Sequence, residues 1–124
     1  AHTMWFSTED IAFMEQDFSR IQRALDGCTA VVCYNDQIAH TIITELKRRG
    51  ISVPGDLSVM GVDNSTLSAL CEVPITTLAH PMERLGEVCA ENILKLIEDP
   101  AFDATMNFAP VLVERASVIR KVSW

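Results

Sequence analysis

The stretch that decides the fold is "TAVVCYNDQIA", residues Thr29 to Ala39. Its first half is a run of β-branched and apolar residues, which is typical of a buried strand. The run ends at Asn35 and Asp36, and an apolar pattern with helical spacing begins directly afterwards. Asn and Asp are favoured as caps and first-turn residues of helices. The stretch therefore predicts a strand, a tight turn and a helix in immediate succession.

The same succession recurs on both sides of this stretch. The expected elements are a β-prone run at 2–6, a helix from Ser7 or Thr8 to Leu25, strands over 57–62 and 74–80, a helical turn over 66–71, a helix from Pro81, and a strand or hairpin over 109–122. Gly27 and Gly50 are expected to end the first two helices. Short strands that alternate with helices predict an α/β fold with a parallel sheet.

Three of the predicted helices carry apolar stripes. The stripe of the first helix consists of Ile11, Met14, Phe18, Ile21 and Leu25. We expect the helix after Asn35 to bury Ile38, Ala39, Ile42, Ile43 and Leu46. For the helix after Pro81, the expected buried face consists of Met82, Leu85, Cys89, Ile93 and Leu96.

Composition and charge limit the classes of function. The chain has 124 residues, a formal net charge of −7 and no basic patch of the kind that nucleic-acid readers carry. It has no apolar run long enough for a membrane helix, and its first residues do not form a signal peptide. Its four cysteines lack metal-ligand or disulfide spacing, so we interpret them as buried thiols in a reducing, cytoplasmic protein. We expect no metal and no cofactor. The four cysteines are Cys28, Cys33, Cys71 and Cys89.

Polar and aromatic residues gather where the predicted strands end. Ligands of open α/β sheets bind at the carboxyl edge of the strands. Carboxylates, carboxamides, an imidazole and an indole together suit a polyhydroxylated ligand, whereas the glycine-rich turn of a phosphate site is missing. Each residue also has a purely structural interpretation, as a helix cap, a turn former, a loop residue or a core ring. The candidate ligand contacts are Trp5, Asn35, Asp63 and His80, with Asp36 and Asn64 as secondary candidates.

Three motifs in order resemble one known family. They are "TAVVCYNDQIA", "KRRGISVPGDLSVMGVDNS" and "PITTLAHPMERLGEVCAENILKLI". Together they resemble the regulatory core of LacI/GalR-family transcriptional repressors, over more than half of the chain. Within that family the sequence looks most like bacterial arabinose repressors, which join such a core to a GntR-type winged-helix DNA-binding domain.

The resemblance implies a periplasmic-binding-protein-like fold with Rossmann-like lobes. Residues 1–124 would be the C-terminal part of a sugar-effector-binding domain, mostly its C-terminal lobe, with the helix over 81–98 on or against the missing lobe. The implied effector is a small sugar, and the likeness to arabinose repressors suggests L-arabinose. Operator DNA would be bound only through an N-terminal domain that this chain lacks. The family usually has Gln at His80 and Asp-Asp at Asp63-Asn64. An imidazole still bonds a hydroxyl group, but its charge changes near neutral pH.

Two other classes of function compete with a repressor. A periplasmic sugar-binding protein shares the fold and the sugar-facing edge, and is the alternative. An enzyme is disfavoured because the chain lacks a nucleophile elbow and lacks the Lys of a receiver domain. Because the last helix would lose its natural cover, we expect a homodimer or a higher closed oligomer with this helix in the interface.

Overall fold

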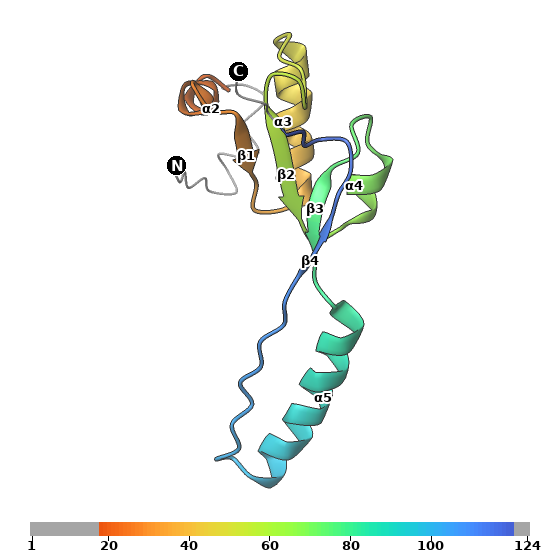
Figure 1. The fold of residues 1–124 in the computed structure, drawn as a ribbon. Helices are drawn as coiled ribbons and strands as arrows, with labels where there is room; N and C mark the ends of the chain where they lie inside the picture. The colour runs from red at the N-terminus through yellow and green to blue at the C-terminus, as the bar shows by residue number, and fades with distance from the viewer. Residues whose placement is uncertain (1–17, 121–124) are drawn as a thin grey trace.

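A computed structural model describes residues 18–120 and shows a sheet with packed helices, from which one long helix extends (Figure 1). Trp5 and most of the predicted first helix lie outside the described residues. The helices are α2 (Ser19–Leu25), α3 (Asp36–Arg48), α4 (Thr66–Leu70) and α5 (Met82–Glu98). The strands are β1 (Ala30–Val32), β2 (Ser58–Val62), β3 (Thr76–Ala79) and β4 (Val111–Val113).

The four strands form one sheet in the order β1-β2-β3-β4. The first three strands are parallel, and β4 runs antiparallel to β3 at the edge of the sheet. The predicted α/β fold with a mainly parallel sheet is therefore confirmed. The predicted strand or hairpin over 109–122 proves to be a three-residue strand followed by an irregular segment. The carboxyl ends of β1, β2 and β3 meet at the edge of the sheet that faces α5 (Figure 1).

The hydrophobic core lies between α3 and the sheet. The predicted apolar face of α3 is confirmed, and the core also takes in Ile21 of α2 and Val59 of β2. Gly27 and Gly50 follow α2 and α3 with φ of +72° and +76°, the left-handed conformation expected of a terminating glycine. The buried α3 residues are Ala39, Ile42, Ile43 and Leu46, with Ile38 packed beside them.

The four cysteines are free thiols. Cys33 lies in the core, where burial raises the pKa of its thiol to about 12 and keeps it protonated and unreactive. Cys28 and Cys71 are only half-buried, and Cys89 is exposed on α5, so the prediction of a buried thiol is wrong at Cys89.

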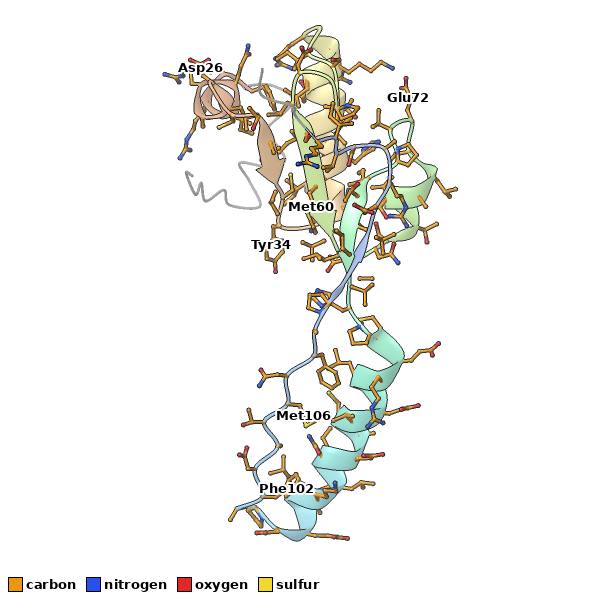
Figure 2. All side chains as sticks on the ribbon, viewed as in Figure 1. Asp26, Tyr34, Met60, Glu72, Phe102 and Met106 are labelled. Carbon is orange, nitrogen blue, oxygen red and sulfur yellow. The ribbon has the colours of Figure 1, made fainter. Side chains whose placement is uncertain are left out.

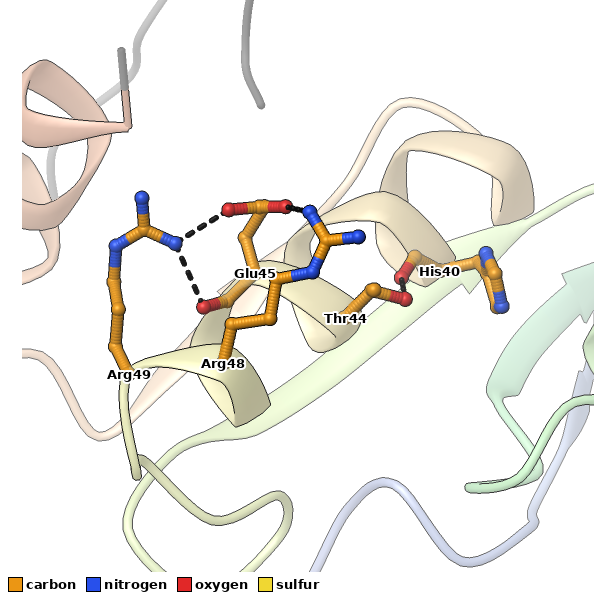
Figure 3. A network of polar contacts seen from close by, with 5 residues as sticks. All are labelled: His40, Thr44, Glu45, Arg48 and Arg49. Carbon is orange, nitrogen blue, oxygen red and sulfur yellow. Dashed lines mark hydrogen bonds and ion pairs between the residues drawn. The ribbon is translucent and has the colours of Figure 1, made fainter. Parts of the chain in front are cut away.

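A charged cluster lies at the C-terminal end of α3. Figure 3 shows the buried carboxylate of Glu45 between Arg48 and Arg49, one turn further along the helix. The Arg49 guanidinium also lies over the ring of Phe18, 4.5 Å from its centroid. The cluster therefore joins the end of α3 to the residue that precedes α2.

The segment after β4 completes the sheet where β2 and β3 diverge. Ser117 is fully buried there, and its carbonyl oxygen accepts a hydrogen bond from the Val59 amide. Its hydroxyl group accepts a bond from the Thr76 amide and donates one to the carbonyl oxygen of Val59. Ser117 thus satisfies backbone groups that the two strands cannot pair with each other.

The opposite end of α3 is held by the carboxylate of Asp36. This carboxylate is 1% exposed and accepts bonds from the Ser65 amide (2.7 Å), the Ser65 hydroxyl (2.9 Å) and the Thr77 hydroxyl (2.6 Å). Gly61 allows the close approach, because a Cβ atom there would lie 2.3 Å from Asp36 Oδ1. The first turn of α3 also favours a negative charge. Asp36 therefore joins the chain segments that follow β1 and β2 to β3.

Helix α5 leads away from the sheet, and the chain returns beside it as an extended segment (Figure 1). The helix buries Val88, and Asn92 donates a hydrogen bond to the carbonyl oxygen of Ala104. The predicted buried stripe of α5 is wrong for Met82, Cys89, Ile93 and Leu96, which are exposed, whereas Leu85 is half-buried. The segment that follows α5 contacts the helix instead, because Lys95 Nζ lies 5.3 Å from the centroid of the Phe102 ring. Figure 2 shows Phe102 beside the end of the helix.

We predict that Asp36→Asn lowers the free energy of unfolding of the 124-residue chain by about 1.5–3 kcal/mol, because the carboxylate serves three donors and a neutral amide serves fewer. Urea denaturation followed by circular dichroism measures the change. The matched control is Asp26→Asn, at an exposed position after α2, with an expected change within about 0.5 kcal/mol. Equal stability of the two variants would contradict the role given to Asp36.

Candidate functional site

Three chain segments converge at the carboxyl edge of the sheet. They are the turn from β1 into α3, the turn after β2, and the residue that follows β3. The contacts of Asp36 with Ser65 and Thr77 hold the three segments together. The edge therefore gathers Asn35, Asp63, Asn64 and His80, as the positions of the strand ends predicted.

Asn35 caps α3, which confirms its predicted structural role. Its Oδ1 atom accepts a hydrogen bond of 2.9 Å from the Ile38 amide. Within residues 18–120 no partner is seen for its Nδ2 atom, so this group is free to donate to a ligand. The contact of Asn35 with a ligand stays a prediction.

The turn after β2 has an unusual backbone. Asp63 and Asn64 both have positive φ, at +101° and +50°, although neither is glycine. Such conformations cost about 1–3 kcal/mol each and cluster at functional sites. The Asp63 amide bonds the carbonyl oxygen of Leu78, and the Asn64 amide reaches the Thr77 hydroxyl group. Both ends of the strained turn are therefore tied to β3.

Asp63 and His80 face each other across the ends of β2 and β3. The distance from Asp63 Oδ1 to His80 Nε2 is 3.9 Å, and the two side chains are 58% and 43% exposed. This separation is too long for a direct hydrogen bond. At this separation, one hydroxyl group about 2.8 Å from each atom would bridge them, donating to the carboxylate and accepting from Nε2–H in the tautomer that carries its proton there.

The remaining sequence candidates differ in accessibility. The Asp36 carboxylate is committed to Ser65 and Thr77 inside the fold, so in this structure it supports the edge and does not face solvent. Trp5 lies outside the described residues. Tyr34, which the sequence patterns did not single out, projects from the carboxyl end of β1 and is 84% exposed (Figure 2).

The sequence patterns also gave no indication of Arg115, in the irregular segment after β4. Its Nη2 atom donates a 2.7 Å hydrogen bond to Asn64 Oδ1. Arg115 is one of several charged residues in this tail, beside Glu114 and Arg120, so nothing in the local pattern distinguishes it. Its partner lies 51 residues earlier in the chain, so sequence spacing does not reveal this contact.

The described part of the chain contains neither a metal-binding cluster nor a membrane-spanning helix. Between residues 18 and 120, no three His, Cys, Asp or Glu side chains gather closely enough to hold a metal ion. None of the helices described has the length and apolar character to cross a membrane.

Known proteins are similar to this chain in sequence and in fold. Residues 4–118 match the family described as periplasmic binding protein-like domain. The arabinose metabolism transcriptional repressor of Geobacillus stearothermophilus is 36% identical over 91 residues, which cover 72% of this chain and 25% of that protein. The transcriptional repressor PurR of Aliivibrio fischeri strain MJ11 is 36% identical over 95 residues, or 76% of this chain and 28% of that protein.

Solved structures agree with these relatives. The Lac repressor dimer bound to operator and the anti-inducer ONPF superposes with a TM-score of 0.73 at 25% identity, over 87% of this chain and 38% of that one. A LacI family regulator from Enterococcus faecium with bound ribose gives 0.69 at 26% identity, over 91% and 41%. The chain spans about a quarter of the length of the curated relatives it matches. It belongs to the periplasmic binding protein-like family, in the form found in LacI-type transcriptional repressors.

Proposed function

We propose that the chain is the ligand-sensing part of a sugar-responsive transcriptional repressor and that it binds a small sugar at the carboxyl edge of its sheet. The observation that carries this proposal is the 3.9 Å gap between Asp63 and His80. An acceptor and a donor at this separation match the two hydrogen-bonding capacities of one sugar hydroxyl group.

Neighbouring groups extend this site toward a polyhydroxylated ligand. The Asn35 amide lies at the same edge and supplies a further donor. Asn64 keeps an amide group beside Asp63, while its oxygen is bonded to Arg115. We propose Trp5 as a further contact that packs against the C–H face of a sugar ring. A ligand that lacks a hydroxyl group leaves one of these polar groups unpaired, which makes the site selective.

The relatives support the choice of ligand class. One matched repressor is named for arabinose metabolism, and a matched regulator structure holds ribose. We propose a pentose, with L-arabinose as the first candidate. Binding would favour one arrangement of the two lobes, and thereby control operator binding in the intact dimer. Operator DNA would be bound through a domain outside this chain.

Relatives also favour a regulator over the two other classes. The Geobacillus stearothermophilus and Aliivibrio fischeri proteins are both named as transcriptional repressors, not as enzymes or exported binding proteins. We therefore propose that the chain performs no chemistry and acts in the cytoplasm. The buried, protonated thiol of Cys33 is compatible with a reducing compartment.

We predict that Asp63→Asn weakens sugar binding roughly 10- to 100-fold, because a charged acceptor contributes about 1.5–3 kcal/mol to such a bond. The measurement is isothermal titration calorimetry of L-arabinose, D-ribose and D-glucose with a full-length protein that contains this chain. Asp99→Asn, at the exposed end of α5, is the matched control and should bind like the unaltered protein. Unchanged affinity in Asp63→Asn, or no binding of any sugar by the unaltered protein, would refute the proposed site.

The exposed apolar face of α5 also supports association of the chain with a second copy of itself. Apolar side chains remain in solvent along this helix, with Ile97 73% exposed. Fully burying one large aliphatic side chain is worth about 1.5–3 kcal/mol, and several together rival the stability of a domain. We propose that a second copy of the 124-residue chain covers this face, as a closed dimer does without further growth. The exposed residues are Met82, Ile93, Leu94, Leu96 and Ile97.

We predict that the 124-residue chain sediments as a dimer or a higher closed oligomer at micromolar concentration. The double substitution Ile93→Glu and Ile97→Glu should shift it toward the 13.8 kDa monomer, because it places charges in the interface. Glu91→Gln on the same helix is the control and should leave the oligomer intact. Sedimentation velocity distinguishes the species, and a clean monomer of the unaltered chain across this range would contradict the proposal.

A further inference from the structure

Arg115 connects the ligand edge to the segment that follows β4. Its guanidinium donates to Asn64 Oδ1 at 2.7 Å, to the carbonyl oxygen of Ile75 at 2.9 Å and to the Ser68 hydroxyl group at 3.0 Å. The Arg115 amide donates to the Thr76 hydroxyl group at 2.9 Å. Among the described residues no carboxylate pairs with this arginine. Its planar fork of donors therefore serves to fix neighbouring chain segments in place.

The backbone of the Asp63–Asn64 turn depends on contacts with neighbouring segments to keep its conformation. Both residues have left-handed φ values. Asp and Asn adopt such values more readily than other non-glycine residues, but still at a cost that contacts with the surroundings offset. Asn64 is held at its amide by Thr77 and at its side chain by Arg115. The direction of the Asp63 carboxylate depends on this backbone, because Asp63 lies between the end of β2 and Asn64.

We propose that Arg115 is a positioning residue. By fixing Asn64, it holds the left-handed turn that directs Asp63 toward His80, and so raises ligand affinity without touching the ligand. This inference rests on the proposed function for its effect on sugar, but its effect on the turn is independent of any ligand. The chain returns from α5 through β4 to the segment after β4 (Figure 1). Arg115 lies in that segment and is bonded to Asn64, so its guanidinium also ties the connection from α5 to the ligand edge.

A purely structural role for Arg115 predicts a different result. Its bonds to Ser68 and Ile75 stabilise the fold in any case, so loss of stability alone does not identify a positioning residue. The substitution Asn64→Gly distinguishes a positioning role from a purely structural one. Glycine adopts a positive φ at little cost, so the turn then no longer needs Arg115 to hold it. If Arg115 acts by holding Asn64, its substitution should matter less once Asn64 is replaced by glycine.

The test compares Arg115→Ala and Arg115→Lys, each alone and combined with Asn64→Gly. Lys keeps the charge and the aliphatic stem but loses the fork, so it remains informative where the Ala variant does not fold. In ¹⁵N-edited NMR spectra of the 124-residue chain, a positive φ gives a strong intraresidue amide–Hα cross-peak. We expect this peak to weaken at Asp63 and Asn64 in the single Arg115 variants. Unchanged peaks in both variants would overturn the proposal.

Affinity provides the second readout, with L-arabinose, D-ribose and D-glucose as probes in a full-length protein that contains this chain. We expect Arg115→Lys to weaken binding about tenfold, and to change it less than twofold when Asn64→Gly is already present. An equal loss in both backgrounds would show a merely structural role. If the unaltered protein binds none of the sugars, the proposed function fails, and the NMR comparison still decides whether Arg115 holds the turn.

Discussion

The Asp36 carboxylate is buried, has no cationic partner among the described residues, and is held by hydrogen bonds from Ser65 and Thr77. A buried anion is expensive unless every lone pair finds a donor, so its surroundings are tightly constrained. Gly61 must lack a side chain, and the turn after β2 must bring the Ser65 amide toward α3. These constraints explain why three separate strand ends form one edge with fixed geometry.

The polar side chains at that edge are the basis of the proposed ligand site. The capping role of Asn35 places its free amide group there, and the strained turn exposes Asp63 beside His80. Helix caps, turns and buried carboxylates are common stabilising devices, yet here they leave unpaired polar groups on one side. These groups are the ones that we propose bind a polyhydroxylated ligand. The interior polar contacts of Asp36 thus support the exposed contacts proposed for the sugar.

Much of this arrangement could be predicted from sequence, because it depends on local patterns. Apolar periodicity identified α3, and terminal glycines identified where α2 and α3 end. The strand ends correctly placed Asn35, Asp63 and His80 at one edge, although sequence could not tell whether Asp36 faces inward or outward. That distinction depends on Gly61, which is distant in sequence and close in space.

Other features depend on long-range contacts and were missed for that reason. Arg115 meets Asn64 across 51 residues, and Ser117 fits between β2 and β3 only because the tail crosses the diverging strands. The prediction of the buried face of α5 was wrong because apolar periodicity identifies a stripe on a helix but not the segment that covers it. In this chain the extended segment covers a neighbouring face, and the stripe itself remains partly exposed.

The most direct test of this account is the rate of hydrogen exchange at the Ser65 amide in the unaltered 124-residue chain. Ser65 lies in a turn, where amides normally exchange fast unless a stable bond holds them. Because its amide donates to the buried Asp36 carboxylate, we expect protection comparable to that of the Asp63 amide, which bonds β3. Exchange as fast as at the exposed residues Met106 and Asn107 would contradict the central role of Asp36.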